Sequence, residues 1–147
     1  MTLYSRSLAF IILVYLFGLG ANAQGTKFEA EYGTLTGSVS VLTAVAGFSG
    51  TGYTGIFQND GDMVTVTFTL AAAGYYNIYL GYAAPYGDKI NNLTVNGNST
   101  GVSFPASASF TETAYVKAWL KEGVNTISIT KSWGWFLLDY FRIEPNT

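Results

Sequence analysis

The sequence predicts an all-β fold, an antiparallel β-sandwich with jelly-roll connectivity. Apolar and polar residues alternate with a period of two through several short segments, as expected of strands that bury one face. Glycine, asparagine and proline turns separate these segments at roughly 8–12-residue intervals, which is typical of sandwiches. After residue 24, no window combines a 3.6-residue period with capping residues. Two sheets packed face to face would satisfy this pattern.

The clearest predicted strand is residues 63–70, where valine, phenylalanine and leucine alternate with three threonines. Residues 75–82 repeat the alternation. The small residues 71–74 lie between the two segments, and a connection this tight favours direct pairing. We therefore predict that the two segments form a β-hairpin.

A second hairpin is predicted around Asn96-Gly97, because this dipeptide is typical of two-residue hairpin turns. Its strands would be residues 90–95 and 99–104. The remaining predicted strands are residues 27–31 and 37–42 near the start, then 114–120 and 126–131 around the turn at 121–123, and finally 136–143.

The first 23 residues read as a secretory signal peptide. Arg6 precedes the apolar run 8–19, and Ala21-Asn22-Ala23 forms a small-x-small cleavage site. The apolar run of about twelve residues is shorter than the roughly twenty that span a bilayer. An uncleaved N-terminal anchor is the alternative. We predict a signal peptide at 1–23 and, at 24–147, one β-sandwich module that is secreted, monomeric and not held in a membrane.

Composition excludes several kinds of chemistry. The 147 residues include no histidine and no cysteine, which removes disulfides, thiolate metal sites and histidine-assisted nucleophiles. The chain has seven basic and nine acidic residues, so it lacks the excess of basic residues that is typical of nucleic-acid-binding domains. A glycosidase needs two carboxylates across a cleft, and no such pair is visible. We predict a non-catalytic domain; a fragment of an enzyme and an adhesion domain that binds protein are the alternatives.

Aromatic residues give the strongest functional signal, since they make up 16% of the chain. The segment Ser132-Trp133-Gly134-Trp135 places two indoles in one loop, where they are hard to bury together. Rings at the end of a sandwich can stack on the apolar faces of sugars. The alternative is that one of these indoles closes the core, and Trp119, within a strand, is predicted to pack. The predicted carbohydrate-binding residues are Trp133, Trp135, Tyr53, Tyr86 and Phe110 as rings, with Asp88, Lys89 and Asn91 as hydrogen-bonding partners.

Three acidic residues form a candidate calcium site. Glu29 and Glu31 are two apart in a predicted strand, so both side chains would point to the same face. Asp139 lies within an otherwise apolar strand, where an unpartnered carboxylate would be costly. Calcium accepts six to eight oxygen ligands of this kind. An exposed strand edge with Lys27 or Arg142 as counter-charge is the alternative.

Two other kinds of short motif carry less information. Asn59-Asp60-Gly61-Asp62 looks like the start of an EF-hand loop, but Val64 at the fifth loop position and Ala71 at the twelfth break the pattern. We predict a turn there. The triplets that begin at Asn92 and Asn98 are glycosylation sequons, which are common by chance.

A series of motifs runs in order through residues 27–144: FEAE at 28–31, GFSGTGY at 47–53, AAGYY at 72–76, YAAPYGDK at 82–89, VNG at 95–97, GVNTI at 123–127 and SWGWFLLDY at 132–140. This series resembles a family 35 carbohydrate-binding module, a relative of family 6. Within that family it is similar to the mannan-binding type attached to β-mannanases. The resemblance implies a β-jelly roll without catalytic activity, and a structural calcium ion at the positions of Glu29, Glu31 and Asp139.

The resemblance also implies where the ligand binds, because family ligands lie in loops at one end of the sandwich. The matching positions are Tyr53, Phe110, Trp133 and Trp135, although family 6 relatives commonly carry tryptophan at the position of Phe110. Relatives that bind uronic acids use a second calcium ion and an arginine. Beyond the leader, Arg142 is the only arginine and lies in a strand. The implied ligand is therefore β-1,4-mannan or a similar neutral glycan, with a tethered glycoside hydrolase as a possible partner.

Overall fold

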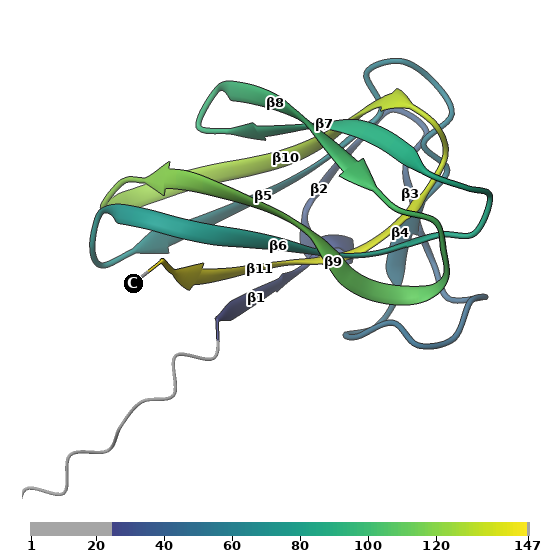
Figure 1. Ribbon diagram of the computed structural model, residues 1–147, viewed down its shortest axis with the longest axis horizontal. Coiled ribbons are helices and arrows are strands. Elements are labelled where there is room, and N and C mark those ends of the chain that lie inside the picture. The colour runs from purple at the N-terminus through teal and green to yellow at the C-terminus, as the bar shows by residue number, and fades with distance from the viewer. Residues whose placement is uncertain (1–24, 147) are drawn as a thin grey trace, which may run out of the picture.

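A computed structural model describes residues 25–146, and these form two antiparallel sheets that face each other (Figure 1). The predicted β-sandwich is confirmed. The predicted signal peptide lies outside the described residues. Within the described part, no helix has the length and apolar character needed to cross a bilayer.

The two sheets contain eleven strands and are accompanied by one short 3₁₀ helix, η1 (Ala30–Tyr32). The six-stranded sheet contains β1 (Thr26–Glu29), β3 (Ser40–Leu42), β4 (Tyr53–Gly55), β6 (Gly74–Ala84), β9 (Ser107–Leu120) and β11 (Leu137–Pro145). The five-stranded sheet contains β2 (Thr34–Thr36), β5 (Met63–Leu70), β7 (Lys89–Val95), β8 (Asn98–Phe104) and β10 (Gly123–Trp133).

The order β3-β4-β11-β6-β9 in one sheet and β2-β5-β10-β7-β8 in the other requires repeated crossings between the sheets. The predicted hairpin of residues 63–70 with 75–82 is wrong, because β5 pairs with β10 and β2 while β6 pairs with β11 and β9. A period of two fixes which face of a strand is buried but not which strand is its neighbour. The β7–β8 hairpin is confirmed, with Asn96 and Gly97 both at positive φ.

The start of the chain also differs from its prediction. The expected strand 27–31 ends at Glu29, and the chain then turns through η1. Glu29 and Glu31 are therefore not two positions of one strand. Ala30 of η1 is fully buried, and this small side chain lets the 3₁₀ turn sit against the core.

The core fills the space between the sheets. Val64, Val66 and Phe68 of β5 are buried, while Thr67 and Thr69 of the same strand are exposed. A smaller apolar cluster closes one end of the sandwich, and its members come from the ends of strands. Buried Tyr53, Ala83 and Leu137 form its centre, and half-buried Leu42, Phe48, Phe110 and Trp135 pack around them.

Trp119 does not pack into this core, contrary to the sequence prediction, and is 56% exposed. The side chains of β9 that point inward are Ala114, Val116, Ala118 and Leu120. Trp119 alternates with them and therefore lies on the outer face, in register with Tyr75 of β6.

Gly81 of β6 allows a tyrosine to lie flat on the sheet. It is in register with Tyr140 of β11, and a Cβ at position 81 would overlap the Tyr140 ring. The ammonium of Lys27 lies 3.8 Å from the centre of the same ring. Tyr140 is thus held close to β6, with Lys27 against its ring.

We expect Gly81→Ala to lower the stability of the fold by about 1–3 kcal/mol, because the new methyl group must displace the Tyr140 ring. Gly74→Ala in the same strand is the matched control, since the nearest atom to its added Cβ is 3.7 Å away. Denaturant unfolding of both variants measures the difference. Equal stabilities would contradict this account of Gly81.

Asp62 ties together two loops. Its Oδ1 accepts a hydrogen bond from the main-chain N–H of Ser38 (2.9 Å), and its Oδ2 accepts bonds from the N–H groups of Gln58 (2.8 Å) and Asn59 (2.9 Å). The bonds from Asn59 and Ser38 are the main reasons why the pKa of Asp62 is lowered. The segment 59–62 is the predicted turn.

We expect Asp62→Asn to destabilise the protein at neutral pH, with a difference that shrinks in acid. The folded-state pKa of Asp62 lies below 3.8, so the carboxylate contributes stability above that value and loses it as the pH falls through the folded-state pKa. Melting temperatures of wild type and variant across this range measure the effect. Asp60→Asn, at a solvated side chain, is the control, and a pH-independent difference for Asp62→Asn would contradict the assignment.

Candidate functional site

Three rings predicted to bind ligand gather at one end of the sandwich. Tyr86, in the loop between β6 and β7, is 73% exposed, and Trp133, at the end of β10, is 64% exposed. Trp135 is half-buried, and its ring centroid lies 5.4 Å from that of Tyr86 with a tilt of 36°. Neither indole is sealed in the core. This end of the molecule therefore presents aromatic faces to solvent.

Tyr53 and Phe110 lie beneath and beside these rings. Tyr53 is only 2% exposed. Its ring therefore offers no accessible surface for the predicted contact with ligand. Its ring centroid lies 5.1 Å from that of Phe110 and 5.7 Å from that of Phe48, and those two rings cover it. Phe110 remains half-buried. Tyr53 acts as the base on which the partly exposed rings rest.

Lys89 holds the two ring-bearing loops together from below. It is 6% exposed, and its Nζ donates hydrogen bonds to the carbonyl oxygens of Tyr86 (2.7 Å), Gly87 (2.8 Å) and Asp88 (3.2 Å). Its aliphatic stem passes Gly134, where a Cβ would overlap it. The ammonium group is thus hydrogen-bonded to main-chain carbonyls. Lys89 therefore positions the Tyr86 loop and does not present a hydrogen-bond donor to a ligand at the surface.

Asn91 and Asp88 differ in accessibility. Asn91 is fully buried, and its Oδ1 accepts a bond from the main-chain N–H of Ser132 (2.9 Å), which anchors the loop that carries Trp133. The Nδ2 of Asn91 has no hydrogen-bond partner. Asp88 is exposed, with Oδ1 accepting from the N–H of Ala106 (2.8 Å). Among the three polar residues predicted to contact ligand, Asp88 alone is exposed.

A hollow of about 220 Å³ lies beside Asp139 and Phe110. Phe48, Phe110 and Glu112 are among the residues that line it. Phe48 and Glu112 line this hollow but were not among the predicted site residues. A ring inside the glycine-rich segment 47–53 was the available signal for Phe48, whereas nothing in the sequence marked Glu112.

The three predicted calcium ligands meet at the loop 49–51. The N–H of Ser49 lies 3.1 and 3.0 Å from the two carboxylate oxygens of Asp139, and the Ser49 hydroxyl donates to Oε2 of Glu29 at 2.7 Å. The N–H of Thr51 donates to Oε1 of Glu31 at 2.8 Å. Two acidic side chains from the start of the described chain and one from β11 are therefore hydrogen-bonded to one short loop.

The chemistry of this cluster suits a hard cation in part. Burial raises the pKa of Asp139 to about 6, and the negative charge of Glu29 adds to this rise. Oε2 of Glu31 is buried without a hydrogen-bond partner. Yet within residues 25–146 no three acidic side chains stand close enough together to hold a metal ion. The donors fit calcium by type and by unmet charge, but not by their present spacing.

Lys27 and Arg142 were the alternative counter-charges for these acids. The Nζ of Lys27 donates to the Ser49 hydroxyl at 3.3 Å, and its charge favours the ionised form of Asp139. Arg142 forms ion pairs with Glu112 and Glu144 instead. Lys27 alone therefore offsets only part of the charge of three carboxylates.

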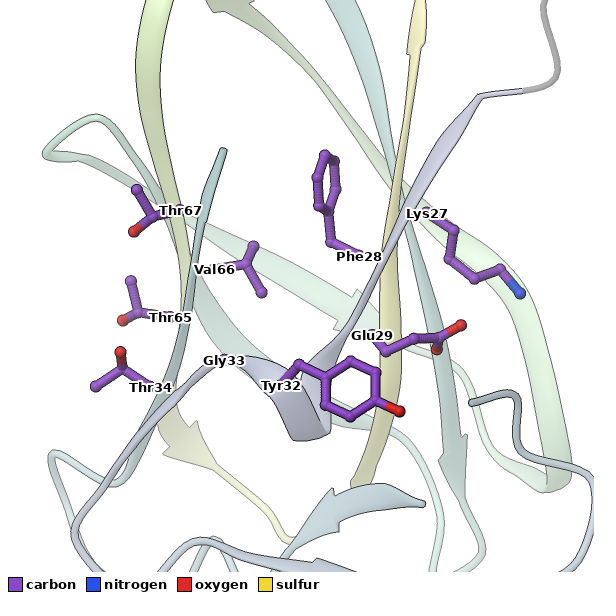
Figure 2. Close-up of a pocket in the computed structure, with 9 residues that line it drawn as sticks. All are labelled: Lys27, Phe28, Glu29, Tyr32, Gly33, Thr34, Thr65, Val66 and Thr67. Carbon is purple, nitrogen blue, oxygen red and sulfur yellow. The ribbon is translucent and has the colours of Figure 1, made fainter. Parts of the chain in front are cut away.

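A larger cavity, with a volume of about 500 Å³, lies on the side of the sandwich between β1–η1 and β2–β5. Figure 2 shows Phe28 and Val66 between the strands, with Thr34, Thr65 and Thr67 along one wall. Tyr32 is its one strongly exposed ring. A sugar polymer needs several accessible ring faces, so the end loops, which carry exposed Tyr86 and Trp133, are the better candidate.

Comparison with known proteins gives several relatives that act on carbohydrates, and mannan endo-1,4-beta-mannosidases are among them. The chain is 39% identical over 144 residues to mannan endo-1,4-beta-mannosidase B of Piromyces sp, which covers 96% of this chain and 25% of that protein. It is 36% identical over 126 residues to a mannan endo-1,4-beta-mannosidase of Thermothelomyces thermophilus, covering 85% of this chain and 26% of the relative. The chain thus spans about a quarter of the length of these relatives.

Solved structures agree with the sequence relatives. The GH26-CBM35 beta-(1,4)-mannanase of Podospora anserina superimposes with a TM-score of 0.80 at 36% identity, over 85% of this chain and 28% of that one. CBM35 from Paenibacillus barcinonensis gives a TM-score of 0.75 at 25% identity, over 83% of this chain and 100% of that one.

The family model for carbohydrate binding module (family 35) matches residues 26–146. The predicted resemblance is thereby confirmed, and with it the prediction of a binding module without catalytic activity. This match covers the whole two-sheet fold, and the chain belongs to carbohydrate-binding module family 35.

Proposed function

We propose that this module binds β-1,4-mannan, or a closely related neutral glycan, on the rings of Tyr86, Trp133 and Trp135. The exposure of Tyr86 and Trp133 at the same end of the sandwich is the observation that carries the proposal. Aromatic faces stack on the apolar faces of pyranose rings, and each ring contact contributes about 1 kcal/mol. With hydrogen bonds to sugar hydroxyls added to these ring contacts, we expect an affinity of roughly 10 μM to 1 mM.

Preorganisation supports binding at this end. The Tyr86 loop is fixed by the three carbonyl bonds of Lys89, and the Trp133 loop is fixed by Asn91. Because these loops are already ordered, little conformational entropy is lost when a ligand binds. Asp88 is the exposed carboxylate available to accept hydrogen bonds from sugar hydroxyls.

A neutral ligand is supported by the charges of the described residues. Arg142 forms ion pairs with Glu112 and Glu144, and Lys89 is buried against carbonyl groups. Neither cation is free to pair with the carboxylate of a uronic acid. Mannan is supported by the names of the two relatives described above, which are mannan endo-1,4-beta-mannosidases.

In the wider protein context, we propose a secreted module that works beside a mannanase catalytic domain. The relatives are about four times longer than the region they share with this chain. A tethered module that holds the polymer raises the effective substrate concentration for its neighbour, so weak binding suffices. Residues 1–23 would direct secretion as a signal peptide.

Calcium is the proposed structural cofactor, held by Glu29, Glu31 and Asp139. A bound cation would neutralise three carboxylates whose mutual repulsion raises the energy of the folded state. It would also fix the loop 49–51, which lies between Phe48 and Tyr53 in the chain. The support is the buried, unpartnered oxygen of Glu31 and the burial of Asp139.

Affinity electrophoresis tests the glycan proposal. We expect galactomannan and glucomannan gels to retard the wild-type protein, with xylan and pectin gels having little effect. Trp133→Ala and Trp135→Ala should each weaken retardation about fivefold, since each removes a ring contact of about 1 kcal/mol. Val124→Ala, which trims an exposed side chain in another region, is the control. Unchanged mobility of the wild type in all four gels would refute glycan binding and favour an adhesion domain.

Thermal unfolding with and without chelator tests the calcium proposal. We expect chelation to lower the melting temperature of the wild type, because ligand-linked stability disappears with the ion. Glu31→Gln should have a lower melting temperature in calcium and a smaller response to chelator. Glu122→Gln, at an exposed turn, should behave like the wild type. A melting temperature that is the same with and without chelator would rule out the site.

A further inference from the structure

A second group of exposed rings lies far from the end loops, on the outer face of the six-stranded sheet. Tyr75 of β6 is 55% exposed, and Tyr115 and Trp119 of β9 are 59% and 56% exposed. The strand register places Tyr75 opposite Trp119, and Tyr79 opposite Tyr115. Four rings from two neighbouring strands therefore share one face.

These rings form two contacting pairs. Tyr75 and Trp119 meet edge to face with centroids 5.2 Å apart, and Tyr79 and Tyr115 stack with centroids 5.4 Å apart. Tyr75 and Tyr79 are four residues apart along β6, which is roughly 13 Å at the usual rise per residue. The two pairs make a platform long enough for more than one sugar unit.

The core does not need these rings. The inward side chains Ile78, Leu80, Ala114 and Leu120 of the same strands are already buried. A contiguous exposed apolar patch of this kind on a small domain marks a binding surface. Its position along two paired strands fits an extended ligand.

The charges on this face favour an uncharged partner. Arg142, which lies 4.1 Å over the Tyr79 ring, is paired with Glu112 and Glu144. Its hydrogen bonds lower the pKa of both carboxyl groups, so both stay ionised and the three groups together carry one net negative charge. Lys117, 5.1 Å over the Tyr75 ring, and Lys27, in register with Arg142, remain as the other cations of this face. Nucleic acid or an acidic peptide would require several unpaired cations here.

Hydroxyl and amide groups adjoin the rings. Trp119 lines a groove of about 310 Å³ between the edges of β8 and β9, and Asn98, Ser99 and Thr100 line it as well. All three polar residues are exposed. An aromatic face beside a row of small hydrogen-bonding side chains is the combination that recognises sugars.

We propose that this ring face, made of Tyr75, Tyr115 and Trp119 with the adjoining groove, is a second carbohydrate-binding surface for a neutral β-linked glycan. The ligand class rests on the proposed function of the end loops. Tyr75 lies near the start of β6 and Tyr86 lies just beyond its end, so the two surfaces are roughly 30 Å apart along the strand direction. One module would then hold a polymer at two places, or hold two chains, and avidity would exceed the affinity of either surface.

The test compares polymer and oligosaccharide binding in four proteins made in bacteria, where Asn98 stays unmodified. These are the wild type, Tyr75→Ala/Trp119→Ala, Trp133→Ala/Trp135→Ala, and Val124→Ala as control. We expect Tyr75→Ala/Trp119→Ala to weaken retardation by galactomannan about tenfold. Calorimetry with mannohexaose should show two sites per wild-type molecule and one in each double variant. Unfolding curves confirm that the outer-face variant is folded, as expected for solvent-facing side chains.

The outcomes separate this inference from the function proposed for the end loops. Wild-type retardation and two mannohexaose sites in Tyr75→Ala/Trp119→Ala would overturn the second surface and leave the end-loop site standing. Loss of all binding in that variant, with normal binding in Trp133→Ala/Trp135→Ala, would support the outer face and refute the end-loop site.

Discussion

The packing of two sheets against each other is the constraint on which the other features of the molecule depend. Each strand gives one face to the shared core, so the other face and the connecting loops are free for other uses. Phe68 and Val66 fill the interior, while Tyr75 and Trp119 stand outside. At one end, buried Tyr53 and Leu137 close the core. That closure provides the base on which the partly exposed rings rest.

The loops at this end are ordered by polar groups that lie below the surface. Lys89 supplies one cation to three carbonyl oxygens of the Tyr86 loop, and Asn91 bonds the loop of Trp133. On the neighbouring side, Ser49 and Thr51 gather three carboxylates. The rings can therefore be exposed and still hold fixed positions, which a weakly binding platform requires.

Much of the fold could be predicted from sequence because burial imposes a period of two on each strand. The partner of a strand could not, since the alternation in residues 63–70 fits either sheet. Trp119 was misjudged although a signal existed: Lys117 occupies the same face, and a lysine there indicates solvent. The burial of Lys89 was not predictable, because its partners are main-chain carbonyls that converge only in the folded loop. Glu29 and Glu31 do meet at one loop, but through η1 and not through a shared strand face.

The central claim is that indoles at the end of the sandwich contact the sugar directly. The chain contains three tryptophans, so three indole N–H signals in a nitrogen–proton correlation spectrum can be followed during titration with mannohexaose. The account predicts that the signals of Trp133 and Trp135 shift together and saturate with one affinity. If both signals stay in place while mannohexaose saturates the protein, the end loops do not bind the glycan.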